Sequence, residues 1–260
     1  MTKIETFKHP FLTQPNIQHG FFTRKGGIST GPFASLNITY SSGDDPIHIV
    51  ENRKRALEHL GLNPQHLIIN RQIHSNRAIY VHKPFTNRDE EAHADGLVTD
   101  QPNLALAVVG ADCPPVLFAD HKQGIIGAAH AGWKGALSGI LESTIDLMIE
   151  KGAKLENINA IIGPAIDQDS YEISLPFFNE FHTINPNYDH FFKKAAKENH
   201  FYFNLKGFCA ERLKQKGLHY VDIMPFDTYS NPLHFFSYRR TCHLNETKYG
   251  NNLNIIALIN

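Results

Sequence analysis

The chain has 260 residues, of which 42% are hydrophobic and 20% are charged, proportions typical of a folded globular protein rather than a disordered one. Its formal net charge of −1 argues against general electrostatic binding to nucleic acid or to acidic membranes. The three cysteines form no Cys-x-x-Cys pair, which argues against a disulfide framework and fits a reducing cytoplasm. We expect neither a secretion signal nor a membrane span, because no apolar run is long and uninterrupted enough.

Strands, glycine turns and one helix are predicted for the first third of the chain. Arg24 lies in the glycine-rich segment 19–32 and is either a solvated surface residue or a donor in an anion-binding loop. An acidic N-cap followed by proline predicts a helix over residues 45–61, which ends at a glycine. Residues 67–81 are typical of two strands that flank a polar turn.

Apolar runs in the middle of the chain end in chemically reactive side chains. The run over residues 107–120 is interrupted by Asp112 and Cys113, which precede a Pro-Pro turn. A further run over residues 127–130 ends at His130, just before a predicted helix. Glycines and other small residues surround both places, as is common where the backbone must approach a ligand closely. The pattern favours an active site.

The second half of the chain is predicted to alternate helices with strands. Lys134 lies at the start of an amphipathic helix over residues 135–151, where it either helps to bind an anion or is solvated. Cys209 lies on the apolar side of a helix capped by Asn204, which predicts a buried core residue. The other expected elements are an apolar strand with a Gly-Pro turn over residues 159–166, Phe-rich helical pieces over 174–197, a strand over 235–240 and a closing strand over 254–259. We expect one α/β domain over residues 1–260.

Three potential metal ligands, His74, Cys113 and His130, each stand at the end of a predicted strand. Two imidazoles and a thiolate leave a fourth position open on zinc, as in catalytic zinc sites. The residues themselves leave two alternatives open. Cys113 and His130 could form a nucleophile–base pair, or Cys113 could have no chemical role.

A series of short motifs in one order resembles a known family. The chain is similar throughout to the bacterial purine nucleoside phosphorylases labelled laccase domain or multicopper polyphenol oxidase and also called peptidoglycan editing factor. The motifs are Phe22-Thr-Arg24-x-Gly-Gly27-Ile-Ser, Ser35-Leu-Asn37, Gln72-Ile-His74-Ser, Ala94-Asp-Gly-Leu-Val-Thr99, Ala111-Asp-Cys113-x-Pro-Val-Leu-Phe, Ala129-His130-Ala-Gly-Trp133-Lys-Gly135, Ile162-Gly-Pro-Ala-Ile166 and Phe236-Ser-Tyr-Arg-Arg240.

The resemblance implies a single α/β domain of sandwiched mixed sheets flanked by helices. It also implies one zinc ion held by His74, Cys113 and His130. The implied activities are phosphorolysis of adenosine, inosine, guanosine and methylthioadenosine, and deamination of adenosine, so the expected partners are purine nucleosides and phosphate. Lys134 stands where the family more usually has arginine, which bears on the phosphate contacts rather than on the zinc site.

Roles follow for the residues around the expected zinc. In deamination, zinc would activate a water for attack on C6 of adenine, and Asp112 is either the proton shuttle or a cap of the turn before Pro114. In phosphorolysis, Arg24 and Lys134 would neutralise the phosphate.

Two other activities remain alternatives. One is a hydrolase of peptidoglycan precursors with Cys113 as nucleophile and His130 as base. The other is a copper-dependent polyphenol oxidase. None of the sixteen histidines forms the His-x-His pairs usual in multicopper oxidases, so copper would occupy a single site in vitro.

Overall fold

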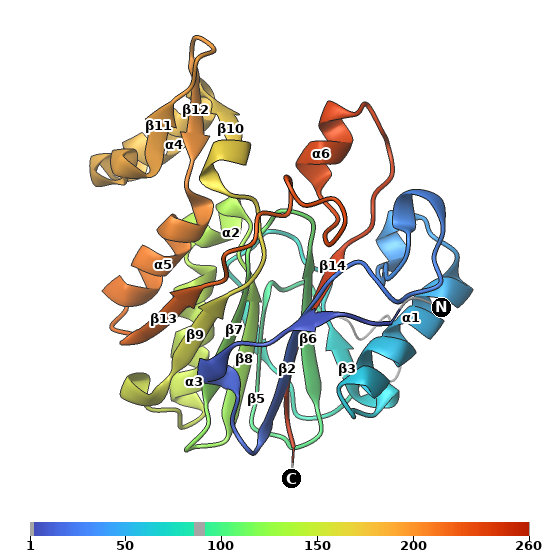
Figure 1. Cartoon of the computed structure of the whole chain (residues 1–260). Coiled ribbons are helices and arrows are strands. Elements are labelled where there is room, and N and C mark those ends of the chain that lie inside the picture. The colour runs from blue at the N-terminus through green and yellow to red at the C-terminus, as the bar shows by residue number, and fades with distance from the viewer. Residues whose placement is uncertain (1–2, 86–91, 260) are drawn as a thin grey trace.

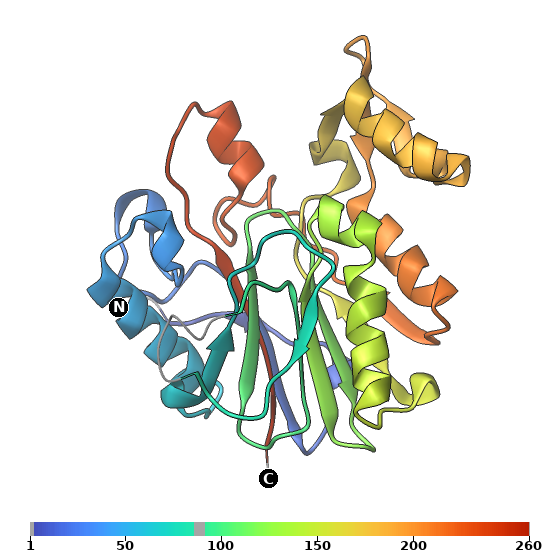
Figure 2. The ribbon, with the colours of Figure 1, turned by 180° about the vertical axis from the view of Figure 1, so that it is seen from behind.

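Two β-sheets face each other at the centre of the computed structural model, which describes residues 3–85 and 92–259. Helices cover the outer faces of both sheets, so that α1 and α3 lie on opposite sides of the molecule (Figure 1, Figure 2). The predicted α/β fold of sandwiched sheets flanked by helices is confirmed. Within the described ranges, no helix combines the length and the apolar character needed to cross a bilayer.

Both central sheets are mixed. The five-stranded sheet is ordered β1-β2-β14-β6-β3, with β3 parallel to β6 and the other pairs antiparallel. The six-stranded sheet is ordered β13-β9-β7-β8-β5-β4, with parallel pairs at its two edges. Their bounds are β1 Thr6–Phe7, β2 Ile17–Phe22, β3 Leu67–Ile69, β4 Ala78–Tyr80, β5 Gly96–Thr99, β6 Ala105–Gly110, β7 Pro115–Asp120, β8 Ile125–His130, β9 Asn159–Ile162, β13 Tyr220–Ile223 and β14 Asn252–Leu258.

The central strands are apolar along their whole length because both of their faces are buried. In β6, Leu106 and Val108 join the core between the two sheets, whereas Val109 joins the core beneath α1. In β7, Leu117 faces the same central core, and Phe118 packs toward the helices on the other side. This alternation follows from the period of two in a β-strand. The strands therefore separate three apolar layers.

The helix predicted over residues 45–61 is confirmed as α1, Pro46–His59, which covers the five-stranded sheet. The Asp45 carboxylate accepts a 2.8 Å hydrogen bond from the Ile47 amide, and Gly61 follows the helix with φ +71°. On the opposite side, α2 (Trp133–Ser138), α3 (Ile140–Glu150) and α5 (Leu205–Gln215) cover the six-stranded sheet. Cys209 of α5 is fully buried, as predicted.

A small third sheet and two further helices lie above one end of the sandwich (Figure 1). Its strands are β10 (Glu172–Ser174), β12 (His200–Phe203) and β11 (Phe192–Lys194), and α4 (Leu175–Ile184) packs beside them. The helical prediction for residues 174–197 is therefore correct for α4 and for the 3-10 turn Pro186–Phe191 but wrong for β11. The second helix, α6, spans Tyr238–His243.

Two other predicted elements differ in the structure. The helix expected over residues 135–151 is interrupted at Gly139, whose φ of +100° separates α2 from α3. The strand expected over residues 235–240 is wrong, because α6 begins within it. There the Ser237 hydroxyl accepts a hydrogen bond from the Arg240 amide and caps the helix. Aromatic composition favoured a strand, whereas this local cap stabilises a helix.

Gly139→Ala should lower the free energy of unfolding by about 1–2 kcal/mol, because a Cβ disfavours the left-handed conformation. Gly139→Asn should lose less, since asparagine tolerates that conformation better than alanine. Urea denaturation followed by circular dichroism measures both changes. Equal stability of the alanine variant and the wild type would show that the break between the helices does not depend on glycine.

Candidate functional site

Three potential ligands meet at the edge where the chain crosses from one central sheet to the other. Cys113 lies in the crossing from β6 to β7, and His74 lies in the crossing from β3 to β4. His130 is the last residue of β8, and its Cα pairs in register with that of Pro115 at the start of β7. Strand pairing therefore brings together side chains that are far apart in the sequence.

The ligand atoms of His74, Cys113 and His130 lie within 4.8 Å of one another. The Cys113 Sγ is 3.9 Å from the His74 Nε2. The imidazole rings of His74 and His130 lie edge to face, with their centroids 4.8 Å apart. Tetrahedral zinc with ordinary bond lengths separates such atoms by about 3.3–3.6 Å. A small inward movement of the side chains would therefore bring the three ligand atoms to the distances of a tetrahedral metal site.

A buried carboxylate, that of Asp95, holds two of the three ligands. It accepts a 2.9 Å hydrogen bond from the His130 Nδ1, which leaves Nε2 to face the cluster. It also accepts from the backbone amides of Ile73, His74 and Ser75 and from the Ser75 hydroxyl. Burial raises the pKa of Asp95, but these hydrogen bonds and the imidazole outweigh it and hold the pKa at about 2. Such partners fix the orientation of metal-binding histidines.

The thiol and the inner imidazole favour each other's charged forms. Burial raises the pKa of Cys113, yet the neighbouring His130 and His74 outweigh burial and lower it to about 7. Burial lowers the pKa of His130, but Cys113 and Asp95 raise it to about 9. The arrangement stabilises a thiolate, the form of cysteine that binds metals and attacks electrophiles.

Gly132 allows the ligands to come this close. A Cβ at this position would lie 2.5 Å from the His74 Cδ2 and 3.2 Å from the Cys113 Sγ. His74 itself has a φ of +59°, an uncommon conformation for a residue other than glycine. The hydrogen bonds to Asp95 therefore hold His74 in a strained backbone conformation. Its imidazole ring lies against the backbone of Gly132, which leaves room for the ring because glycine has no side chain.

Asp112 points away from solvent and connects the cluster to α6. Its carboxylate accepts hydrogen bonds from the Thr228 hydroxyl at 2.7 Å, the Ser237 hydroxyl at 3.0 Å and the Arg239 amide at 2.6 Å. Burial raises the pKa of Asp112, although these donors oppose the rise. Its φ of +92° is also uncommon, and strain of this kind often occurs at functional sites.

Two cavities meet at the cluster. One, which we call the aromatic cavity, has a volume of 490 Å³, within the range of small-molecule sites. Trp133, Tyr171 and Phe177 contribute aromatic surface to it. The other, which we call the basic cavity, has a volume of 1050 Å³ and is lined by Arg53 and Arg71. The walls of both cavities include His74, Ala111, Cys113 and Tyr238.

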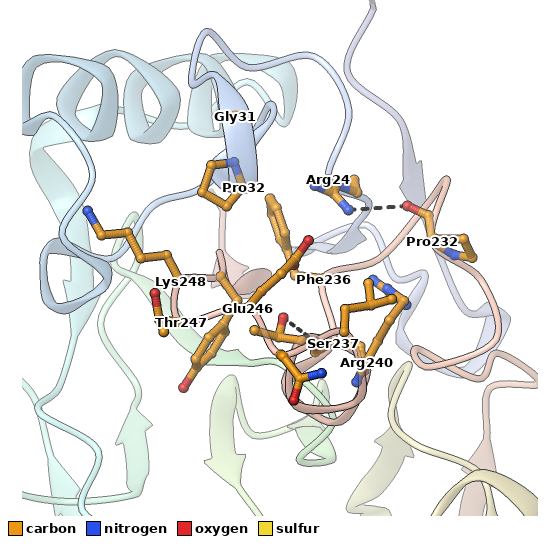
Figure 3. Close-up of a pocket in the computed structure, with 14 residues that line it drawn as sticks. Arg24, Gly31, Pro32, Pro232, Phe236, Ser237, Arg240, Glu246, Thr247 and Lys248 are labelled. Atoms are coloured by element: carbon orange, nitrogen blue, oxygen red, sulfur yellow. Dashed lines mark hydrogen bonds between the residues drawn. The ribbon is translucent and has the colours of Figure 1, made fainter.

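The two residues predicted to bind phosphate lie elsewhere. Arg24 lines a third cavity of 670 Å³, and its guanidinium donates to the Ala34 and Pro232 carbonyls and stacks on Phe236 (Figure 3). Burial and the nearby Arg240 lower the pKa of Arg24 to about 10. Lys134 is exposed on α2, with its ammonium 5.3 Å from the Trp133 ring. Neither Arg24 nor Lys134 lines the aromatic cavity or the basic cavity.

Several residues of the site are not among those predicted from the sequence. Asp95 stands there only within the motif Ala94-Asp-Gly-Leu-Val-Thr99, although a carboxylate between two predicted histidine ligands is a usable signal. Gly132 is one of the glycines whose presence next to His130 indicated a close approach of the backbone, but the sequence does not say which side chains it meets. Tyr238 carries no such signal, because its place between two cavities depends on the fold.

Asp95→Ala should reduce zinc affinity by about 10–100-fold, because His130 and the loop of His74 lose the acceptor that orients them. Competition with a chromophoric chelator measures the affinity. The matched control is Asp120→Ala, which removes a buried carboxylate at the far end of β7 that accepts from three backbone amides. The control should lose stability but keep its zinc affinity. Equal zinc affinity in both variants would contradict the role of Asp95.

Gly132→Ala should also weaken zinc binding, since the added methyl group occupies space next to the His74 ring. The variant should fold, with the loss appearing in the zinc content measured by atomic absorption after gel filtration. Zinc content equal to that of the wild type would show that the loop of His74 moves aside without consequence.

The chain is similar to known proteins over most of its length. Residues 18–259 match the family model described as multi-copper polyphenol oxidoreductase laccase. A purine nucleoside phosphorylase of Rickettsia conorii is 40% identical over 214 residues, which cover 81% of this chain and 85% of that protein. One from Mycobacterium tuberculosis is 34% identical, with 84% of each chain covered.

Solved structures share the whole fold. Protein NMB0706 of Neisseria meningitidis is 31% identical with a TM-score of 0.84, covering 99% of this chain and 100% of that one. YlmD of Geobacillus stearothermophilus is 27% identical with a TM-score of 0.87, covering 97% and 94%. The chain therefore belongs to the family described as multi-copper polyphenol oxidoreductase laccase, whose similar members include proteins named purine nucleoside phosphorylase.

Proposed function

We propose that this protein is a zinc-dependent purine nucleoside phosphorylase that also deaminates adenosine. The observation that carries the proposal is the cluster of His74, Cys113 and His130, of which His74 and Cys113 line the aromatic cavity. Its relatives named purine nucleoside phosphorylase support the same reaction class. The proposed substrates are adenosine, inosine, guanosine and methylthioadenosine together with phosphate.

The donor set fits zinc. Two imidazole nitrogens and one thiolate are preferred zinc ligands, and the open fourth position is the mark of a catalytic site. When bound, the ion would supply Lewis-acid chemistry to an oxygen of substrate or water. A reducing compartment such as the cytoplasm would suit the site, because Cys113 must remain a thiolate.

The aromatic cavity offers a place for the purine. The rings of Trp133 and Phe177 lie 4.6 Å apart on its wall, and flat apolar surfaces of this kind pack against a nucleobase. Arg239 donates to the Glu172 carbonyl at 2.6 Å and lies over the Tyr171 ring, and these contacts fix that part of the cavity wall. Binding here would place the reacting part of a nucleoside beside His74 and Cys113.

Asp112 is the proposed proton shuttle of the deaminase reaction. Its buried carboxylate lines the aromatic cavity next to Cys113, and the pKa raised by burial favours a group that can hold a proton. In the same position it anchors the N-terminus of α6. Proton transfer and anchoring are compatible, because a carboxylate has two oxygens and several acceptor positions.

The alternative hydrolase is favoured by one specific observation. The Cys113 thiol lies beside the His130 imidazole, and the Asp95 carboxylate is hydrogen-bonded to the other side of that ring. A nucleophile, its general base and the group that orients the base are arranged in this way in thiol hydrolases. Such an enzyme, acting on peptidoglycan precursors, would work without metal and lose activity to a thiol alkylator.

The polyphenol oxidase alternative has less support. A multicopper mechanism needs several metal sites, and residues 3–85 and 92–259 contain one group of metal-binding geometry. Copper in that single site is therefore proposed only as a substitute for zinc in vitro.

The test is chromatography of adenosine incubated with metal-analysed protein, with and without phosphate. Adenine and ribose 1-phosphate should form only with phosphate, and inosine should form in both tubes. Cys113→Ala should lose zinc and both activities together, because one ligand of three is removed. Cys242→Ala is the matched control, since Cys242 is exposed and lies outside the cluster.

Two results would contradict the proposal. Activity of Cys113→Ala without metal would exclude a zinc mechanism. Turnover of peptidoglycan precursors, but not of nucleosides, by metal-free wild-type protein would establish the hydrolase in its place.

A further inference from the structure

We infer that the cavity beside Arg24, which we call the arginine cavity, is a second ligand site that binds the phosphoryl group of a small molecule (Figure 3). Among its described lining residues, none is shared with the aromatic cavity, and Tyr249 alone is shared with the basic cavity. Such a site goes beyond the proposed function, because it would bind its ligand whether or not the cluster turns over nucleosides.

The helix α6 separates the arginine cavity from the cluster. The residues of α6 and its two caps that line the arginine cavity recur three or four positions apart, so they share one face of the helix: Ser237, Arg240, Thr241 and Leu244. Tyr238 lies on another face and lines the aromatic and basic cavities. A ligand in the arginine cavity would therefore contact α6 away from the candidate zinc site, as a second ligand rather than as a reactant.

Positive side chains outnumber negative ones in the described lining of the arginine cavity. The cations are Arg24, Arg240 and Lys248, and the one carboxylate is that of Glu246. Among the residues that the structure describes, none of these four side chains forms an ion pair. The cavity therefore carries positive charge that no described side chain neutralises by direct contact.

The two guanidinium groups lie in surroundings that disfavour their charge. Burial and the nearby Arg240 lower the pKa of Arg24 to about 10, although Glu246 opposes the fall. Burial also lowers the pKa of Arg240, against the attraction of the Asp112, Asp227 and Glu246 carboxylates. A bound anion would stabilise both charged groups.

The guanidinium groups are held by neutral partners and keep donors to spare. The Arg24 Nε donates to the Ala34 carbonyl at 2.6 Å, its Nη1 donates to the Pro232 carbonyl at 3.3 Å, and the group lies over the Phe236 ring. Its Nη2 donates to no described residue. Arg240 uses both of its terminal nitrogens on three carbonyls, those of Thr228, Tyr229 and Phe235, but not its Nε. Oriented guanidinium groups with spare donors bind phosphoryl oxygens through charge-assisted hydrogen bonds.

The size of the cavity leaves room for more than a phosphate ion. Its volume of 670 Å³ lies within the range of sites for small organic ligands. Phe236 and Tyr249 supply apolar surface, whereas Asn245 and Thr247 can form hydrogen bonds with hydroxyl groups. This combination suits a sugar phosphate. Free phosphate offers the same phosphoryl chemistry and is the other possible source.

The experiment is calorimetric titration of the zinc-loaded protein with ribose 5-phosphate and, separately, with inorganic phosphate. Lys248→Met should raise both Kd values about twofold to fivefold, because an exposed positive charge is lost. Glu246→Gln should lower both by a similar factor, because a negative charge that competes with the ligand is lost. Both side chains are exposed, so the variants should fold. Arg24 and Arg240 are kept, since their replacement would also remove hydrogen bonds to the backbone.

Matched controls come from α1. Lys54→Met and Glu58→Gln alter an exposed ion pair that lies outside the arginine cavity, so both should leave the Kd values unchanged. Ribose 5-phosphate that binds more tightly than inorganic phosphate would identify an organic phosphate as the ligand. Equal Kd values would identify free phosphate.

Cys113→Ala distinguishes the arginine cavity from the cluster. The binding that depends on Lys248 should persist in this variant, because Cys113 does not line the arginine cavity. Its persistence, in a protein whose wild type shows no phosphorolysis of nucleosides, would support the second site and refute the proposed function.

Three results would overturn the inference. One is the absence of binding heat with both ligands. Another is binding that Cys113→Ala abolishes and Lys248→Met leaves unchanged, which would assign the phosphate to the cluster. The third is an equal Kd in the wild type, Lys248→Met and Glu246→Gln, which would show that the charge of the arginine cavity does not hold the ligand.

Discussion

The carboxylate of Asp95 is the constraint on which the candidate site depends. It is 1% exposed and accepts hydrogen bonds from His130 and from three consecutive backbone amides. Without this acceptor, the positive φ of His74 would not be stabilised, and the His130 ring could rotate. A single buried charge thus orders two ligands, and its own burial is offset by the hydrogen bonds that it receives.

The surrounding sheets explain why such a charge can be held in place. Strands that are apolar on both faces make a rigid sandwich, and the crossings between its two sheets bring Cys113 and His74 to one edge. Side chains fixed on strand ends and short crossings keep their geometry better than those on long loops. The outer helices complete the burial, and α6, which is tied to Asp112, forms a wall shared by the two cavities.

Much of this architecture follows from sequence patterns, and the rest depends on distant contacts. The apolar runs, the cap at Asp45 and the buried Cys209 are local signals that act within one element, and the structure confirms them. The cluster of His74, Cys113 and His130 was named from strand ends and family motifs, but its geometry needed strand pairing. The contacts of Arg24 could not be predicted, because the sequence of a glycine-rich loop does not say whether its arginine donates to a ligand or to backbone carbonyls.

The placement of Cys113 and His74 in two separate crossings between the central sheets has a consequence for folding. Cys113 and His74 are 39 positions apart in the sequence and belong to crossings that join opposite halves of the sandwich. An ion held by them would act as a reversible cross-link, closing a chain loop that the unfolded protein leaves open. Its binding energy would then add to the stability of the native state in proportion to the logarithm of free metal concentration. The supply of metal in the cell would set how much of this chain persists folded, as well as how much of it is active.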